Sequence, residues 1–366
     1  MNPKKILFVL ERRVYTGFFR NIFFKFDSER VHRAFVLIGV FLQNCAFMKW
    51  LVGRLFSYKN RILEQEILGL WFANPVGLAG GFDKNGEIAG LMKNVGFGFT
   101  EVGSLTAKPC LGNKGKRMER LVDKESLWVN IGLANKGVEK VIRRISGARV
   151  GIPVGINIAK TNCKETAELN GGLKDYIFSL RRCLQESVGD YYVINISCPN
   201  SYGGQDFAEP KRYELLLKEI DKLKIEKPVL IKFSPDLEKK IVDKLLKISE
   251  RHEVEGFIIS NLTKKHRFGK GGLSGKLVGK KADEMLRYVY KKVKNGGGKF
   301  VLIGAGGIFN AEDAYRKIKL GADLVQLVTG MIYEGPGVIG EINLGLVGLL
   351  EKDGFRNVGE AVGSGV

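Results

Sequence analysis

Histidine, cysteine and long apolar runs are all scarce in this chain of 366 residues, and each shortage excludes a class of protein. A histidine-rich metal site is not supported by three histidines, and the five cysteines are odd in number and share no metal-type spacing. Neither a zinc site nor a disulfide framework is expected, and a reducing, cytosolic setting is indicated. The apolar run at residues 34–42 has nine members, well short of the about 20 that a membrane-spanning helix needs.

Acidic residues are outnumbered by basic ones, which gives the chain a net charge of +20. The excess is concentrated near the N-terminus, where residues 1–61 hold 12 Lys and Arg against three acidic residues, a net +9. Such a balance favours an anionic partner, which is a nucleic acid, an anionic membrane surface or an acidic ligand. The net charge by itself does not choose among these partners.

Residues 1–60 also differ from the rest of the chain in their aromatic content. Phenylalanines at positions 18, 19, 23, 24 and 26 are interleaved with Arg20 and Lys25. Basic and aromatic residues at helical spacing predict one or two amphipathic helices that lie in a membrane interface. A helical cap packed on the main domain would show the same pattern, and the pattern leaves both interpretations open. We expect an N-terminal amphipathic helical segment at residues 1–65.

Eight short β-rich runs alternate with amphipathic helical stretches from about residue 66 onwards. The runs are residues 75–79, 98–103, 153–158, 191–196, 228–233, 256–260, 299–304 and 323–328. The helical stretches include residues 174–187, 210–224, 237–251, 279–294 and 311–319. This alternation predicts an α/β fold, a (β/α)8 TIM barrel over residues 66–350 with a tail at residues 351–366. The long connection at residues 108–147 is expected to cover the barrel mouth.

Polar or glycine-rich clusters follow these runs, at the rim where barrels of this type carry their active sites. They contain Gly80, Gly81, Lys84, Ser104, Asn157, residues 195–200, Lys232, Ser260, Asn261, residues 271–275, residues 304–307 and Thr329. The glycines after the last two runs occupy the position where barrels bind a phosphate group through backbone N–H groups. The lysines suit the polar edge of a flavin or an anionic substrate, and the asparagines suit an amide-rich heterocycle. Together they predict flavin mononucleotide (FMN) and a small planar amide substrate, although a solvated rim position would also explain each lysine.

Residues 195–200, with the sequence Asn-Ile-Ser-Cys-Pro-Asn, form the most informative of these clusters. The apolar run before them delivers amide, hydroxyl and thiol groups to a strand end, and Pro199 stops the strand because it has no N–H group. The Cys198 thiol can exchange a proton, and the two asparagines can hold a flat polar ligand. A small buried cysteine beside a turn is the alternative interpretation.

These motifs resemble the dihydroorotate dehydrogenase family over about residues 18–345. The resemblance is carried by residues 74–86, 96–98, 101–104, 155–158, 195–200, 271–275 and 302–308. It implies oxidation of dihydroorotate to orotate in pyrimidine (UMP) biosynthesis, with hydride passing from substrate C6 to FMN and Cys198 removing the proton from C5. The implied FMN-binding residues are Gly80, Gly81, Lys84, Ser104, Asn157, Asn195, Lys232, Ser260, Gly275, Gly307, Val328 and Thr329. The implied substrate-binding residues are Lys84, Asn130, Asn195, Asn200 and Asn261.

Two features of the chain resemble different classes of this family. Cys198 at the base position is similar to the soluble class, which uses fumarate or NAD, whereas the quinone-using, membrane-associated class generally has serine there. Residues 24–32 are similar to the helical extension of the quinone class, and so are residues 112–117, where that class places an arginine at its quinone tunnel. The extension is a whole added element, so we expect a membrane quinone as electron acceptor and a peripheral location on the cytoplasmic side of the cell membrane.

Two positions depart from the family pattern. A gapless alignment on Gly132 places Val129 where the family has an asparagine that contacts orotate, and Asn130 reaches that position only if the loop is one residue shorter. Leu262 replaces the threonine or serine that usually follows Asn261. A lost hydrogen bond to a buried polar substrate costs about 1–3 kcal/mol, so both changes bear on substrate affinity.

Two other functions are compatible with parts of the sequence. A flavoprotein similar to the tRNA dihydrouridine synthases would also be an FMN barrel with Cys-Pro at its fourth strand, and its RNA would suit the basic charge. The basic excess, however, lies in the aromatic N-terminal segment, so no nucleic-acid partner is expected. A non-enzymatic, membrane-bound flavin-binding protein would explain Val129 and Leu262. The retained Lys84 and Cys198 favour an enzyme, and the sequence leaves the oligomeric state open.

Overall fold

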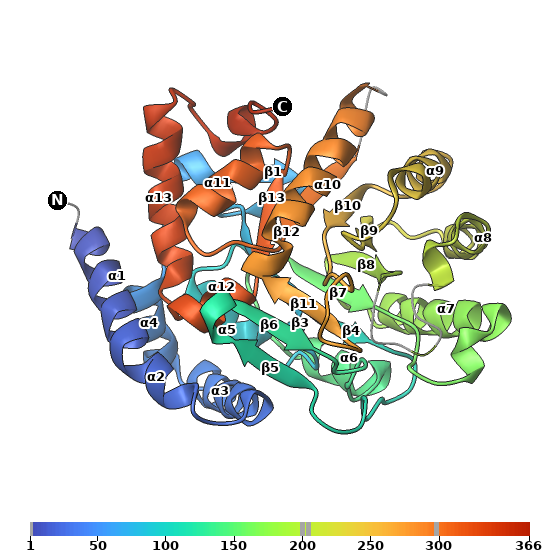
Figure 1. Ribbon diagram of the computed structural model, residues 1–366, viewed down its shortest axis with the longest axis horizontal. Coiled ribbons are helices and arrows are strands. Elements are labelled where there is room, and N and C mark those ends of the chain that lie inside the picture. Colours follow the sequence, from blue (N-terminus) through green and yellow to red (C-terminus); the bar gives the residue numbers. More distant parts are fainter. Residues whose placement is uncertain (1–2, 198–201, 203–205, 296–299) are drawn as a thin grey trace.

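The computed structural model describes residues 3–197, 202, 206–295 and 300–366, and its centre is a closed barrel of eight parallel strands (Figure 1). The strands pair in chain order around the barrel, and the last strand, β13, closes it by pairing with the first, β3. They are β3 (Val76–Asp83), β4 (Phe99–Leu105), β7 (Val154–Ile158), β8 (Tyr191–Asn195), β9 (Val229–Phe233), β10 (Gly256–Ile259), β12 (Val301–Ala305) and β13 (Leu324–Leu327). The predicted TIM barrel is confirmed.

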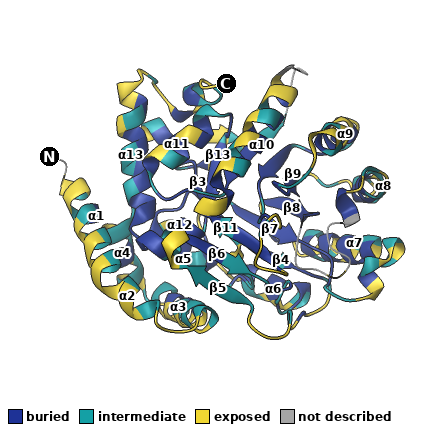
Figure 2. Ribbon diagram, viewed as in Figure 1, coloured by how far each residue is buried: buried dark blue, intermediate teal, exposed yellow. Residues whose placement is uncertain are grey.

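Helices surround the barrel and cover the outer faces of its strands (Figure 1). They are α5 (Ala89–Val95), α6 (Val138–Ile145), α7 (Leu169–Gln185), α8 (Pro210–Asp221), α9 (Lys239–Ser249), α10 (Lys276–Asn295), α11 (Ala311–Lys319), α12 (Thr329–Glu334) and α13 (Val338–Lys352). Strands covered by helices are buried on both faces, which is why they appear in the sequence as continuous apolar runs. Figure 2 shows the consequence, with buried strands inside a ring of helices whose outer faces are exposed.

Two small antiparallel sheets stand outside the barrel. Strands β5 (Met118–Leu121), β6 (Ser126–Val129) and β11 (Gly272–Gly275) form a sheet in the order β11-β6-β5. This sheet lies in the connections that follow β4 and β10, so the region expected to cover the barrel mouth contains regular strands. The other sheet is the hairpin of β1 (Gln65–Ile67) and β2 (Leu70–Phe72).

The N-terminal segment forms a helical layer against one side of the barrel (Figure 1). It consists of α1 (Pro3–Val14), a π-helical turn (Tyr15–Phe19), α2 (Arg20–Phe23), α3 (Ser28–Gln43) and α4 (Ala46–Phe56). Asp27 caps α3, because its side chain accepts hydrogen bonds from the backbone N–H groups of Glu29 and Arg30. The amphipathic helical extension predicted from the sequence is therefore present.

Large apolar side chains remain exposed on the outer face of this layer. Phe41 on α3 is 66% exposed, Phe47 on α4 62% and Phe26 in the turn before α3 61%, whereas Val36 on α3 and Val52 on α4 are buried. None of the helices in the described ranges is by itself long and apolar enough to cross a membrane. Helices α3 and α4 reach that length and apolarity only as a pair, which is bent by 114°.

Candidate active site

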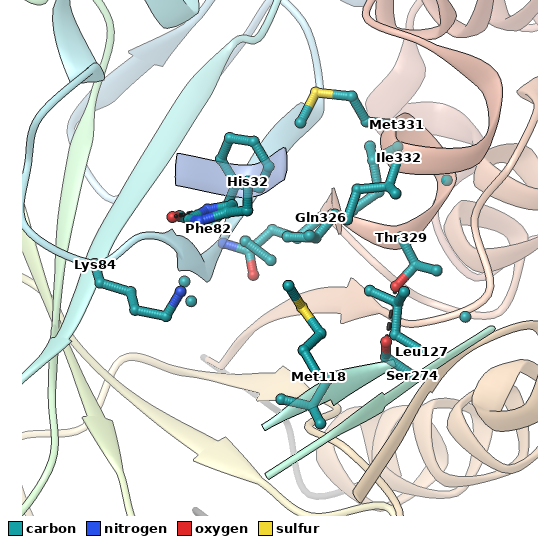
Figure 3. Close-up of a pocket in the computed structure, with 18 of the residues that line it drawn as sticks. His32, Phe82, Lys84, Met118, Leu127, Ser274, Gln326, Thr329, Met331 and Ile332 are labelled. Carbon is teal, nitrogen blue, oxygen red and sulfur yellow. Dashed lines mark hydrogen bonds between the residues drawn. The ribbon is translucent and has the colours of Figure 1, made fainter. Parts of the chain in front are cut away.

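A cavity of about 440 Å³ lies between the C-terminal ends of the barrel strands and the N-terminal helices. Its inner part is lined by polar side chains and glycines of the strand ends, and its outer part by apolar side chains of α3, α4, α5 and α12. Figure 3 shows side chains from both parts, with Lys84, Met118 and Gln326 directed into the same space. The two parts are continuous, so one cavity joins a polar compartment to an apolar one.

Most of the residues predicted from the sequence line the polar compartment. These residues are Gly80, Gly81, Lys84, Ser104, Asn195, Lys232, Ser260, Asn261, Gly275, Gly307, Val328 and Thr329. They come from the ends of different strands and the turns that follow them. The convergence follows from barrel geometry, because the carboxyl ends of all eight strands meet at one rim.

A chain of hydrogen-bonded amides crosses the floor of this compartment. Asn195 Nδ2 donates to Ser104 Oγ at 2.8 Å, and Asn261 Nδ2 donates to Asn195 Oδ1 at 3.3 Å. Asn261 Nδ2 also lies 3.0 Å from Ser197 Oγ, on the residue that precedes Cys198. The amides are therefore held in place by the protein itself and present a pre-organised polar surface to a ligand.

Four predicted residues are placed differently or lie outside the described ranges. Asn157 does not line the cavity but stands directly behind it, where Oδ1 accepts a hydrogen bond from the Ser104 hydroxyl. Asn130 faces away from the cavity, since its Oδ1 accepts a hydrogen bond from Asn113 Nδ2 at 2.8 Å, and its neighbour Val129 lines the cavity instead. Cys198 and Asn200 lie outside the residues that the structure describes.

The two predicted lysines occupy different electrostatic environments. Burial lowers the pKa of Lys84 to about 8, so its ammonium group still predominates at neutral pH. Lys232 is 5% exposed, and its Nζ lies 3.8 Å from the carboxylate of Glu101, which is fully buried. Both lysines can therefore present positive charge to an anionic ligand in the cavity, but the charge of Lys232 is partly countered from behind.

Glu101 and Gln326 stand next to the predicted site, and neither is among the site residues expected from the sequence. Glu101 lies on β4 and Gln326 on β13, and Gln326 Nε2 donates a hydrogen bond to Glu101 Oε1. The signal in the sequence was a charged or amide residue within an otherwise apolar run, Thr100-Glu101-Val102 and Val325-Gln326-Leu327. Strands of a parallel barrel are buried on both faces, so a polar residue inside one must find a polar partner in the interior.

The apolar compartment is built by the N-terminal helices against α5 and α12. Its lining includes Phe35, Ile38, Leu42, Val52, Phe56, Leu91, Met92, Val95, Met118, Met331 and Ile332. His32 on α3 is a polar member of this lining, and its Nε2 lies 2.9 Å from the backbone oxygen of Phe82. Burial lowers the pKa of His32 to about 4, with a further contribution from Lys84, so the imidazole is neutral at physiological pH.

Arg120 is the arginine that lines this compartment, whereas the family resemblance implies an arginine within residues 112–117. Arg120 lines the cavity, and it donates hydrogen bonds to Ser28 Oγ at 2.9 Å and to the backbone oxygen of Phe23 at 2.8 Å. Arg117 does not line the cavity and forms an ion pair with Glu29 of α3. Arg120 lies on β5 and Arg117 directly before it, and both contact the start of α3. This short strand therefore ties α3 to the region beside the barrel.

The residues of the polar compartment fit a phosphorylated, planar cofactor. Gly307 adopts a φ of +76°, and a Cβ atom there would lie 2.5 Å from the Cα of Gly279, so only glycine leaves this turn intact. Ser274 and Thr329 add hydroxyl groups, which lie 2.8 Å apart (Figure 3). Within the described part of the chain, Gln326 Oε1 is buried without a hydrogen-bond partner, and a ring N–H group of a ligand would satisfy it.

The fold and the site together define the class of the protein, a (β/α)8-barrel enzyme with a polar site at the strand ends and an apolar access compartment. Residues 62–350 match the family model of dihydroorotate dehydrogenase. The dihydroorotate dehydrogenase (quinone) of Haloarcula marismortui is 39% identical over 317 residues, which cover 84% of this chain and 87% of that protein. The enzyme of the same name from Gloeobacter violaceus is 34% identical and covers 94% and 97% of the two chains.

A solved structure agrees with these sequence comparisons. The crystal structure of a dihydroorotate dehydrogenase from Eimeria tenella in complex with ferulenol has a TM-score of 0.79 and 26% sequence identity, over 92% of this chain and 95% of that one. The chain therefore belongs to the dihydroorotate dehydrogenase family, on its quinone-dependent side. This result confirms the family inferred from the motifs, and it favours the N-terminal extension over Cys198 as the indicator of class.

Proposed function

We propose that the protein oxidises dihydroorotate to orotate in pyrimidine biosynthesis, with FMN as its cofactor and a membrane quinone as its electron acceptor. The observation that carries this proposal is the continuity of the cavity, in which an amide-lined compartment opens into an apolar one. A polar redox substrate suits the first compartment and a lipid-soluble acceptor suits the second. The names of the relatives support the same reaction.

In this proposal the strand-end residues hold the cofactor and the substrate. The proposed FMN ligands are Gly80, Gly81, Lys84, Ser104, Asn195, Lys232, Ser260, Gly275, Gly307, Val328 and Thr329. Asn157, which stands behind the cavity, would support them through its hydrogen bond with Ser104. Lys84, Asn195, Asn200 and Asn261 hold the substrate, and the ammonium group of Lys84 pairs with the substrate carboxylate. Asn130 would join them only after leaving its hydrogen bond to Asn113.

The chain's own residues orient the substrate and move the proton. The hydrogen-bonded amides of Asn195 and Asn261 fix the plane in which a flat substrate lies. Cys198 accepts the proton from substrate C5 as a thiolate, which requires a pH near the usual thiol pKa of about 8.5 or a neighbour that lowers it. The chemistry that bound FMN supplies is acceptance of hydride from substrate C6 and release of the electrons to the quinone.

Residues 1–65 form, in our proposal, the membrane and quinone-access segment of a peripheral enzyme on the cytoplasmic side of the cell membrane. The exposed phenylalanines of α3 and α4 and the net charge of +9 in residues 1–61 support binding to an anionic bilayer surface. Residues 66–350 carry the catalytic barrel, and residues 351–366 form the tail. Liposomes containing anionic lipid should bind the full chain but not a variant that lacks residues 1–60. Equal binding of both would contradict this assignment.

Anaerobic half-reactions test the proposed reaction directly. Dihydroorotate should bleach the flavin absorbance of the purified protein, and a quinone should restore it at least tenfold faster than fumarate or NAD does. Reoxidation by fumarate or NAD at the rate seen with quinone would place the protein with the soluble class. A flavin that dihydroorotate does not reduce would refute the substrate assignment.

The pH dependence of flavin reduction tests the role of Cys198. If Cys198 is the base, the rate should rise through one ionisation near the thiol pKa, and Cys198→Ser should move or remove that ionisation. Cys183→Ser is a matched control, because Cys183 is buried in α7 away from the cavity. An identical pH profile in the wild type and in Cys198→Ser would assign the proton transfer to another group.

A further inference from the structure

One fully buried carboxylate, that of Glu101, collects polar groups from four other strands of the barrel. It accepts hydrogen bonds from Gly80 N on β3 at 3.2 Å, from Asn157 Nδ2 on β7 at 3.1 Å and from Gln326 Nε2 on β13. Lys232 Nζ on β9 completes the set at 3.8 Å. Hydrogen bonds and a charge from this many strands are what a carboxylate requires to remain ionised in a barrel interior.

Glu101 does not itself reach the cavity, but three of its partners do. Gly80, Lys232 and Gln326 line the polar compartment, whereas Glu101 is 0% exposed and stands behind them. Any effect of Glu101 on a ligand is therefore transmitted through these neighbours and through its electric field. That arrangement makes Glu101 a positioning residue.

The carboxylate determines how the Gln326 amide is oriented. An ionised carboxylate only accepts hydrogen bonds, so the amide must turn its NH₂ group toward Glu101. Its Oε1 is then left buried without a partner in the described part of the chain, as an acceptor for a ligand in the cavity. A glutamine at position 101 would remove this constraint, because a neutral amide donates as well as accepts.

The carboxylate also counters the charge of Lys232. The distance of 3.8 Å is too long for a strong hydrogen bond, and Lys232 Nζ has no hydrogen-bond partner among residues 3–197, 202, 206–295 and 300–366. Its protons are thus available to a ligand, while the negative charge behind it weakens the positive field that the ligand experiences. Reduction adds negative charge to a flavin, so this balance affects how easily a flavin is reduced.

We propose that Glu101 sets the reduction potential of the bound flavin by countering Lys232 and by fixing the Gln326 amide with its oxygen toward the cavity. The inference rests on the proposed binding of FMN and deepens it. Removal of the negative charge stabilises the reduced flavin, so Glu101→Gln should raise the midpoint potential. We expect the reduction equilibrium to shift at least tenfold, which is about 30 mV for a two-electron couple.

The test is a spectroelectrochemical titration of flavin-loaded wild type, Glu101→Gln and a control. The matched control is Asp283→Asn, which also neutralises the acidic partner of a buried lysine, because Asp283 Oδ1 lies 2.6 Å from the Nζ of Lys317. That pair joins α10 to α11 outside the barrel, so the control should lower the melting temperature and leave the potential unchanged. If Glu101→Gln binds flavin stoichiometrically and its reduction equilibrium constant differs less than twofold from that of the wild type, the proposal is overturned.

A second pair of variants covers the case in which Glu101→Gln does not retain flavin. Lys232→Met leaves the carboxylate uncompensated, and Lys232→Met combined with Glu101→Gln removes both charges together. The double variant should have a reduction equilibrium at least tenfold more favourable than Lys232→Met, and equal values would overturn the proposal. Wild-type protein that binds no flavin would refute the proposed function as well, whereas a flavin with an unmoved potential refutes only the role of Glu101.

Discussion

Arg120 holds the entrance of the apolar compartment together, and its replacement by methionine should loosen that entrance. Its guanidinium donates hydrogen bonds to Ser28 Oγ and to the backbone oxygens of Phe23 and Phe26, and it lies 4.7 Å from the ring centre of Phe24. Three hydrogen bonds contribute about 1 kcal/mol each and the cation–π contact about 0.5–1 kcal/mol. Because water replaces some of these bonds when Arg120 is removed, the link should lose roughly 3 kcal/mol of stability. That free energy corresponds to about a hundredfold change in the equilibrium between closed and open forms of this link.

Hydrogen exchange of the backbone amides measures this opening. The amides of residues 24–31 should exchange about a hundredfold faster in Arg120→Met than in the wild type, whereas amides of the barrel strands should be unaffected. Arg33→Met is the control, because Arg33 lies on the exposed face of α3. Equal exchange at residues 24–31 in wild type and Arg120→Met would refute the idea that this arginine fixes the link between α2 and α3.

Three further changes follow from the geometry. Burial raises the pKa of Glu11 to about 7, so between pH 5 and 7 the folded chain holds a proton that the unfolded chain releases. The free energy of unfolding should therefore fall by about 1–2 kcal/mol between pH 5 and 8, after allowance for partial exposure. Urea unfolding of Glu11→Gln should not show this dependence on pH. Gly307→Ala should lose bound flavin, because its Cβ meets Gly279, whereas Gly269→Ala, with a φ of +79° and nothing within 4 Å, should retain flavin despite the same backbone strain. Burial lowers the pKa of His32 to about 4, so the neutral ring contributes to stability above pH 6.5, and this contribution disappears as the pH falls toward 4. The free energy of unfolding of His32→Gln should not show this loss when it is measured over the same pH range.

The barrel could be predicted from the sequence because its strands are buried on both faces. Such strands appear as short apolar runs, and the runs at residues 191–196 and 228–233 coincide with β8 and β9 to within a residue at each end. The polar residues that follow the runs were also found, because their position after a strand end is visible in the sequence. The sheet of β5, β6 and β11 was not predicted, since its strands have four residues each and burial does not alternate along them.

The site was predicted less completely where function depends on contacts between distant segments. Alignment of the family pattern on Gly132 brings Asn130 to the substrate only if the loop is one residue shorter, but its amide is held by Asn113, a partner 17 positions away that no local pattern reveals. Arg117 and Arg120 have similar sequence surroundings, and only the packing of α3 against β5 separates the ion-paired arginine from the one in the cavity. Glu101 was visible as a charge within an apolar run, but its partners come from four other strands.

The two compartments of the cavity are mechanically connected through β3. His32 on α3 bonds to the backbone oxygen of Phe82, and the flanking positions in the chain are Gly81 and Asp83, followed by Lys84. A displacement of α3 would break this hydrogen bond and leave the oxygen of Phe82 unpaired, at a cost of about 1–3 kcal/mol, unless Phe82 moved with the helix. The second course would carry Gly81 and Lys84 along, so a movement of α3 is coupled to the position of Lys84 in the polar compartment. The N-terminal segment thus helps to support the polar compartment of the cavity.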